Sequence, residues 1–363
     1  MIRLKKNPQK DFIILNLSDP QLSDNEWGLN GEETERQKKY KVFLHTTNEL
    51  VNKIKPDLIT ISGDISYPNC PTAYKKFGDY FDSLQIPWAV IWGNHDNQWD
   101  LEAIDRVVDM YSKYKYFVFE AGEREIGSGN YVIIIEEEGR PVEGLVMMDT
   151  HDVIFYSKED TVQSTLERGT ADLMLTHREQ IEKLAERGHE EKDLSWIHPK
   201  LTSKQVSWYR NQIRQLKDFG CNDTTLITHV PIYAYREAFK AALKEEINPL
   251  EVTVEESYGA TCWNEGYEES FGVVHEKGVI GSHPINDGVF EAVLELGTTK
   301  TILCGHDHAN NFVTNYKGVK FAYALKTGPG CYWRPYLNGG TVLRVGSEGI
   351  KELYHEYVDG NIL

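Results

Sequence analysis

The stretch LCGHDHANN (residues 303–311) decides the fold, because an apolar run ends there in a loop that carries two histidines. If residues 301–304 form a buried strand, Gly305 marks its end, and His306 and His308 lie in the loop that follows. In extended backbone, residues two positions apart point to the same side, so both imidazole rings can reach one ligand. Taken alone, such a pair is more often two solvated loop histidines than a metal site.

The same pattern, an apolar run that ends in polar donors, recurs along the chain. The other four examples are SDPQ (18–21), SGDISY (62–67), WGNHDN (92–97) and THVP (228–231). Apolar runs predict strands over 12–19, 57–64, 87–96, 224–231 and 300–304, a hairpin over 131–139 and 144–152, and C-terminal strands within 311–325 and 340–357. Helical patterns cover 32–55, 71–84, 203–218 and 286–296. Alternating strands and helices favour a largely parallel central sheet, with sites at the carboxyl ends of its strands.

These strand ends collect carboxylate, amide and imidazole side chains at one edge of the predicted sheet. The candidate donors are Asp19, Gln21, Asp64, Tyr67, Asn94, His95, Asp96, His229, His306 and His308. Each cluster alone is weak, because a strand that ends in Asp and a Gly-Asp turn are both common. Together, their hard oxygens and neutral imidazoles suit two adjacent divalent or trivalent first-row ions.

Composition indicates a soluble protein with a large core. The chain has 363 residues, 40% of them hydrophobic, and contains no repeat or linker-like tract, so we expect one domain over residues 1–363 with loop insertions at 153–200 and 236–283. Five scattered cysteines favour free thiols in a reducing compartment. The N-terminal apolar run is too short for a signal peptide or a membrane span, so we expect a cytoplasmic protein.

The charge balance narrows the class of partner. The net charge is −17, from 56 acidic and 39 basic residues, which argues against nucleic acid or an anionic membrane as the main partner. A small phosphorylated substrate or a phosphoprotein remains compatible, because bound metal ions can dominate the local field.

The order and content of the five clusters resemble the calcineurin-like metallophosphoesterase superfamily. Its pattern is D-x-H, G-D, G-N-H-D/E, a lone His and G-H-x-H, and the match extends from residue 19 to residue 308. The resemblance implies a four-layer α/β/β/α sandwich, in which helices flank two mixed sheets, and a binuclear metal site at one edge of the sheets.

The resemblance also implies a role for each matching residue. Asp64 would bridge two ions; Asp19 and His308 would bind the first, and Asn94, His229 and His306 the second. His95 would lie beside the substrate phosphate and protonate the leaving oxygen. Asp96 would hold the His95 ring and fix its tautomer, although a carboxylate that caps a turn is an equal alternative.

The first motif departs from the family pattern, because Gln21 stands where the histidine is expected. Tyr67, three residues after Asp64, resembles the G-D-x-x-Y motif of purple acid phosphatases, whose tyrosinate binds ferric iron. Tyr67 or Gln21 could therefore be a ligand, and the pair of ions would be Fe with Mn or Zn. The alternative is a tyrosine that packs on the sheet edge. The phrases SDPQL, WGNHDN and GHDHANNF resemble purple-acid-phosphatase-like or Dcr2-like phosphoesterases.

The function implied is hydrolysis of a phosphomonoester or phosphodiester by a metal-bound hydroxide at a binuclear site. The alternative is a non-catalytic scaffold or regulatory binding protein that retains the metallophosphoesterase fold.

Overall fold

Two mixed β-sheets form the centre of the molecule in a computed structural model, which describes residues 1–23, 35–67, 70–96, 101–160, 175, 177–259 and 261–361. In spatial order, the seven-stranded sheet comprises β1 (Ile2–Lys6), β5 (Tyr131–Glu137), β6 (Arg140–Met147), β9 (Thr224–Ile227), β10 (Thr299–Cys304), β12 (Val319–Tyr323) and β11 (Val313–Tyr316). The five-stranded sheet comprises β14 (Gly349–Tyr357), β13 (Gly339–Gly346), β2 (Phe12–Leu17), β3 (Leu58–Ser62) and β4 (Trp88–Ile91).

Each sheet combines parallel and antiparallel pairs. The strands that lead to the predicted site pair in parallel, β2 with β3, β3 with β4, and β9 with β10. The predicted hairpin forms the antiparallel pair β5–β6, and β13 joins β2 in antiparallel register. The strand–helix alternation alone favours a largely parallel sheet, whereas the observed pairs form the two mixed sheets that the family resemblance implies, because the C-terminal strands divide between them.

The two sheets pack face to face through alternate residues of their strands. Ile14 and Leu58 of the five-stranded sheet share a buried cluster with Ile133 and Leu145 of the seven-stranded sheet. Their sequence neighbours point outward into different clusters, as Leu15 does in β2. Central strands such as β3, β4 and β9 bury both faces, which explains their mainly apolar sequences. Fully burying one large apolar side chain is worth about 1.5–3 kcal/mol.

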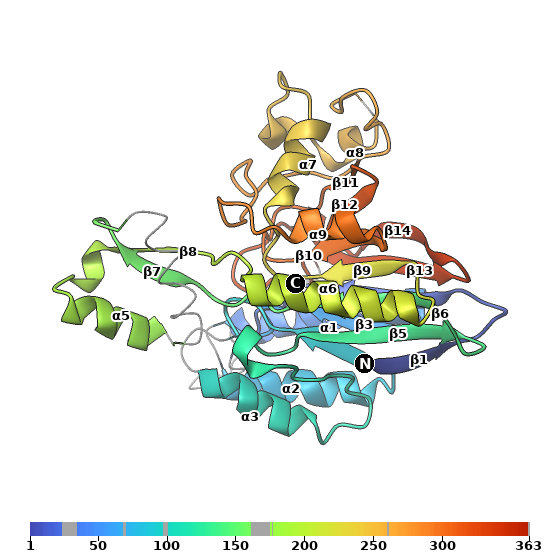
Figure 1. Ribbon diagram of the computed structural model, residues 1–363, viewed down its shortest axis with the longest axis horizontal. Helices are drawn as coiled ribbons and strands as arrows, with labels where there is room; N and C mark the ends of the chain where they lie inside the picture. Colours follow the sequence, from blue (N-terminus) through green and yellow to red (C-terminus); the bar gives the residue numbers. More distant parts are fainter. Residues whose placement is uncertain are drawn as a thin grey trace.

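Helices cover the outer face of each sheet. The cluster on the five-stranded sheet includes side chains of α1 (Glu35–Ile54), α2 (Pro71–Ser83) and α3 (Leu101–Tyr111). The cluster on the seven-stranded sheet includes α6 (Ser203–Asp218), α7 (Ala234–Ala242) and α9 (Val289–Leu296). Figure 1 shows α2 and α3 on one side of the sheets and α7 and α9 on the other. The predicted four-layer α/β/β/α sandwich is confirmed.

Local sequence explains the sharpest of these boundaries. Thr202 accepts a hydrogen bond from the backbone N–H of Gln205, whose side chain accepts one from Thr202 N in return, so α6 begins at Ser203 as predicted. Pro71 opens α2 at a position where its missing N–H costs nothing.

The two stretches expected as insertions, of which residues 161–174, 176 and 260 lie outside the described ranges, contribute differently to the fold. Residues 153–200 contain the two-stranded sheet of β7 (Ile154–Ser157) and β8 (Leu194–Ile197) and the helix α5 (His177–Glu186), which project to the left in Figure 1. Residues 236–283 contain most of α7, which packs in the helical layer, followed by the short α8 (Val254–Ser257) and long loops. Within the described ranges, no helix combines the length and the apolar character needed to cross a membrane.

Candidate metal centre

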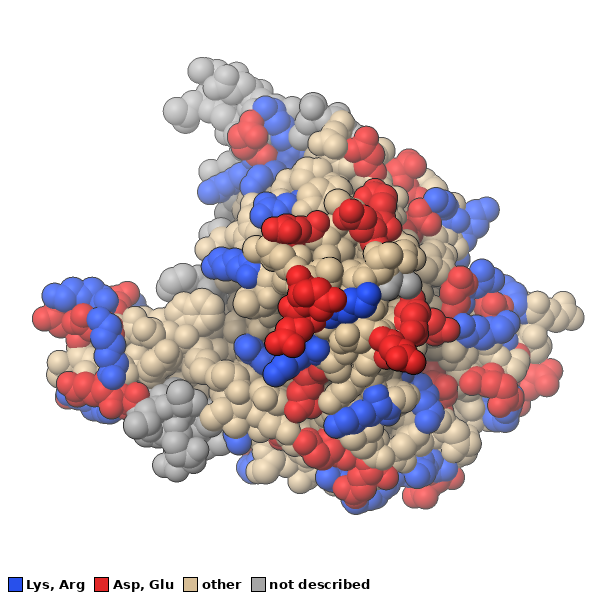
Figure 2. All heavy atoms as spheres, turned by 90° about the horizontal axis from the view of Figure 1, so that it is seen from above, with Lys and Arg blue, Asp and Glu red and all other residues tan. Residues whose placement is uncertain are grey.

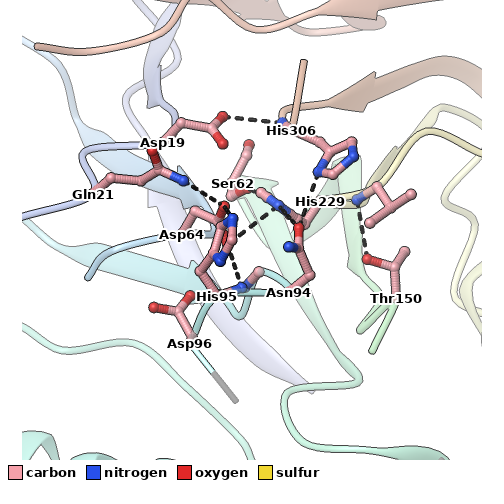
Figure 3. A network of polar contacts seen from close by, with 12 residues as sticks. Asp19, Gln21, Ser62, Asp64, Asn94, His95, Asp96, Thr150, His229 and His306 are labelled. Carbon is pink, nitrogen blue, oxygen red and sulfur yellow. Dashed lines mark hydrogen bonds and ion pairs between the residues drawn. The ribbon is translucent and has the colours of Figure 1, made fainter. Parts of the chain in front are cut away.

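Five strands deliver polar side chains to one edge of the two sheets. Each of these residues follows the carboxyl end of its strand: Asp19 after β2, Asp64 after β3, Asn94 after β4, His229 after β9 and His306 after β10. Except for His306, each of these residues exposes less than 5% of its surface to solvent. Figure 3 shows their side chains pointing toward one another. The parallel strand pairs bring the ends of both sheets together, as the sequence predicts.

One set of donors is centred on the side-chain oxygen of Asn94. Asn94 Oδ1 lies 3.0 Å from His229 Nε2 and 3.0 Å from His306 Nδ1 (Figure 3). Asp64 Oδ1 lies 3.4 Å from the same Nε2 atom of His229. Donors bound about 2.1 Å from one ion lie about 3 Å from their neighbours, so this set can hold one ion.

A second set of donors shares Asp64 with the first. Ligand atoms of Asp19, Asp64 and His308 all lie within 4.8 Å of one another. Asp19 Oδ2 accepts hydrogen bonds from Ser18 Oγ and from the backbone N–H of His306. Its other oxygen, Oδ1, is buried without a hydrogen-bond partner among the described residues and lies 3.3 Å from His308 Nε2. An orphaned carboxylate oxygen beside an imidazole nitrogen fits a cation.

Backbone carbonyl groups orient two of the imidazole rings. His229 Nδ1 lies 2.6 Å from the carbonyl oxygen of Ser62, and His308 Nδ1 lies 3.0 Å from that of Tyr332. A carbonyl oxygen can only accept, so each Nδ1 carries the proton and donates it. Nε2 of each ring is therefore the nitrogen directed at the carboxylates, and it is the nitrogen that would bind a metal once it has lost its proton.

Electrostatics shows how the site is balanced without a cation. Burial alone would raise the pKa of Asp64, but the charges of His229 and His95 hold it well below its usual value. Burial lowers the pKa of His229, yet the carboxylates of Asp64 and Asp19 raise it to about 10. The protonated ring of His229 thus neutralises the carboxylates in the position that a bound cation would take over, with release of the proton.

The backbone is strained at the donors. Asp19, Asp64 and His306 have φ values of 53°, 54° and 78°, in the left-handed region that non-glycine residues rarely occupy. A glycine with no room for a side chain precedes both Asp64 and His306. A Cβ atom on Gly305, for example, would collide with Ser18 Oγ and Asp19 Oδ2. Strain of this kind is characteristic of functional sites and is held in place by the surrounding structure.

Gln21 and Tyr67 both lie at the site, in different roles. Gln21 Nε2 donates to Asp64 Oδ2 over 2.9 Å, and its Oε1 is buried without a hydrogen-bond partner among the described residues. Tyr67 is 37% exposed, and its ring packs edge-on against His95 with centroids 4.5 Å apart. Gln21 thus orients the shared carboxylate, and Tyr67 lies at the rim; ligation by either residue stays a prediction.

His95 is placed at the mouth of the centre. Its side chain is 24% exposed, its Nε2 lies 3.9 Å from Asp64 Oδ2, and its backbone N–H donates to Asp64 Oδ1. The ring can therefore face both the donors and an incoming substrate.

Asp96 differs from the expectation that it would hold the His95 ring. Asp96 Oδ1 accepts from the backbone N–H groups of Ile65 and Ser66 and from Tyr74 Oη, and Oδ2 accepts from Gly93 N. His95 Nδ1 has no hydrogen-bond partner in the described part of the chain. Asp96 instead fastens the loops after β3 and β4 to each other, which is the turn-capping alternative.

Two further residues lie at the site; sequence reasoning missed His198 and considered Lys326 only as a contact for a second phosphate. His198, directly after β8, is buried, and its ring packs edge-on against His306 with centroids 4.4 Å apart. Lys326 is buried and donates its Nζ proton to the backbone carbonyl of Asp19; burial lowers its pKa to about 8. Neither residue belongs to a recognisable motif, and only the fold brings them to the centre.

Comparison with known proteins gives a family match over most of the chain. A sequence model described as calcineurin-like phosphoesterase matches residues 12–310. The chain is 26% identical over 353 residues to an Arabidopsis thaliana protein named "Probable inactive purple acid phosphatase 14", and the match covers 89% of this chain and 72% of that protein. It is 28% identical over 167 residues to the phosphatase DCR2 of Saccharomyces cerevisiae, which covers 41% of this chain and 28% of that protein.

Solved structures of similar shape include a dimetal phosphatase from Danio rerio. It superposes with a TM-score of 0.49 at 12% sequence identity, over 95% of this chain and 98% of that one.

Proposed function

This chain belongs to the calcineurin-like phosphoesterase family, and on that premise we propose that it hydrolyses a phosphomonoester or phosphodiester at a binuclear metal centre. The observation that carries the proposal is the convergence of Asn94 Oδ1 with His229 Nε2 and His306 Nδ1, next to the unpartnered Oδ1 of Asp19. Asp64 lies between the two sets of donors and would bridge the ions.

The donors suit first-row ions, and Fe paired with Mn or Zn is the proposed content. A bound pair of such ions would lower the pKa of a water molecule and neutralise charge on the phosphoryl oxygens. Gln21 would keep the Asp64 carboxylate in its bridging orientation. His95, with its ring at the mouth of the centre, would donate a proton to the leaving oxygen.

The proposed substrate is a small phosphorylated molecule or a phosphoprotein. Figure 2 shows acidic and basic side chains interspersed over the visible face, and the net charge of −17 would repel a polyanion. A membrane or nucleic-acid partner is therefore not part of the proposal. All five cysteines are free, which supports a reducing, cytoplasmic location.

A second candidate is a non-catalytic binding protein that keeps the centre. It is favoured by the word "inactive" in the name of the Arabidopsis relative. Such a protein would bind ions or a phosphorylated ligand without turnover.

Turnover with defined metals separates the two candidates. The protein would be stripped with a chelator, reconstituted with manganese, zinc or iron, and assayed with p-nitrophenyl phosphate and bis(p-nitrophenyl) phosphate. We expect metal-dependent hydrolysis that Asn94→Ala abolishes and that Asn222→Ala, the same change at an exposed loop position, leaves intact. Ion binding without hydrolysis of either ester would favour the binding protein.

A further inference from the structure

A cavity of about 260 Å³ lies beside the metal centre and is not used by the donors themselves. Gln21 and Tyr67, which touch Asp64 and His95, form one side of its lining. Arg36 and Lys39 of α1 line it as well, together with Cys331. A group that leaves the phosphoryl centre past His95 would therefore meet the basic side chains of α1.

Among the described residues that line this cavity, basic side chains outnumber acidic ones. Glu35 also lines the cavity, but its carboxylate is engaged by Lys38 Nζ at 2.6 Å. Lys39 Nζ contacts the backbone carbonyl of Cys331 at 3.3 Å, and neither Lys39 nor Arg36 forms an ion pair with another residue of the described ranges. Within the described ranges the cavity lining thus carries two cations and one carboxylate, a local positive surplus in a chain of net charge −17.

From this arrangement we propose that the cavity binds a second oxyanion, a phosphate or carboxylate, on the leaving-group side of the substrate. The inference rests on the proposed function and narrows its substrate class to molecules with two anionic groups. The planar guanidinium of Arg36 matches the two oxygens of such a group, and Lys39 adds a point charge. The volume suits one oxyanion with a short linker, since whole drug-sized ligands occupy about 300–1,000 Å³.

Alkylation of Cys331 can report whether an anion binds in the cavity, without any measurement of catalysis. It is the exposed member of five free cysteines, the other four being buried, so a neutral alkylating reagent should select it. Metal-free protein would be treated with iodoacetamide, with inorganic phosphate or with sodium chloride of equal ionic strength, and alkylation followed by mass spectrometry. We expect phosphate to slow alkylation about fivefold once it exceeds its dissociation constant about fourfold.

Variants of α1 identify the source of the protection. Arg36→Gln combined with Lys39→Gln should abolish it, whereas Lys53→Gln, the same change at the far end of α1, should preserve it. Equal alkylation rates with and without phosphate would overturn the proposal. Protection that survives in the double variant would also overturn it, because phosphate would then act elsewhere.

Turnover gives the second readout. Phenyl phosphate and 4-carboxyphenyl phosphate differ by one carboxylate, and we expect kcat/KM to favour the carboxylated ester about tenfold. In the double variant, the ratio of the two kcat/KM values should fall to the ratio set by the chemical reactivity of the two leaving groups alone. An unchanged ratio would contradict the proposal, while no turnover of either ester would contradict the proposed function and leave the alkylation result to decide the cavity.

Discussion

At the scale of single residues, the donor side chains are positioned by a strained backbone, and hydrogen bonds between loops stabilise that backbone conformation. Left-handed φ values at Asp19 and Asp64 cost on the order of 1–3 kcal/mol each. Compensating bonds tie the two loops together, from Gln21 N to Asp64 O over 2.9 Å and from Asp19 N to Gly63 O over 3.2 Å. The donors are therefore fixed before any ion binds, which lowers the cost of ordering them.

His95 allows a prediction about the leaving group. If its ring protonates the leaving oxygen, His95→Ala should lower kcat about 10²–10³-fold for an alkyl phosphate, whose leaving group needs a proton. The loss should be about tenfold or smaller for p-nitrophenyl phosphate, whose leaving group departs as an anion. Steady-state kinetics over a series of leaving groups checks this, and an equal loss for all esters would show that His95 does not supply the proton.

At the scale of elements, the two-stranded sheet of β7 and β8 supports the centre from outside the two large sheets. His198 follows β8 and packs against the His306 ring with an interplanar angle of 89°. Burial and the charge of His229 lower the pKa of His198 to about 4, so its ring is neutral at physiological pH and does not repel a cation. The small sheet thus limits the movement of the His306 ring, a candidate metal ligand.

His198→Ala should therefore weaken ion binding at the position shared by Asn94, His229 and His306. We expect about a tenfold loss of affinity, the lower end of what changes behind a metal ligand cause. His198→Phe keeps an aromatic edge against His306 and should restore most of the affinity. Titration of metal-free protein with Mn²⁺ or Zn²⁺ measures both variants; equal losses for Ala and Phe would mean that ring packing is not what matters.

The sequence predicts the elements and the convergence of polar side chains at the strand ends well, because both depend on short-range patterns. The helix over 203–218 and the donors Asp64, Asn94 and His229 follow directly from apolar runs and their polar ends. The division of strands between two sheets, the contact of His198 with His306 and the loop-fastening role of Asp96 depend on residues distant in sequence. No local pattern encodes them.

At the scale of the whole molecule, a buried histidine links the two sheets. His355 of β14 donates from Nε2 to the backbone carbonyl of Asn311, over 2.8 Å, and its Nδ1 lies 3.1 Å from Thr341 Oγ1 of β13. Asn311 lies two residues before β11, at the edge of the other sheet. Burial lowers the pKa of His355 to about 4, so the folded protein keeps this ring neutral.

The lowered pKa of His355 predicts that the folded protein loses stability in mild acid. The unfolded chain binds a proton at His355 below pH about 6.5, and the folded chain only near pH 4, so the free energy of unfolding falls as pH drops through that window. Between pH 7 and pH 5 the loss from this residue should be roughly 2 kcal/mol. Urea denaturation of His355→Gln should show a pH dependence smaller by that amount, and an unchanged dependence would contradict the assignment.

The central claim is that one chain holds two ions with Asp64 between them. The most direct measurement is the number of tightly bound ions per chain, by elemental analysis after reconstitution and desalting. We predict two ions for the unaltered protein, one for Asp19→Ala or for Asn94→Ala, and none or one weakly bound for Asp64→Ala. One ion or none in the unaltered, folded protein, or two ions retained in Asp64→Ala, would contradict the account.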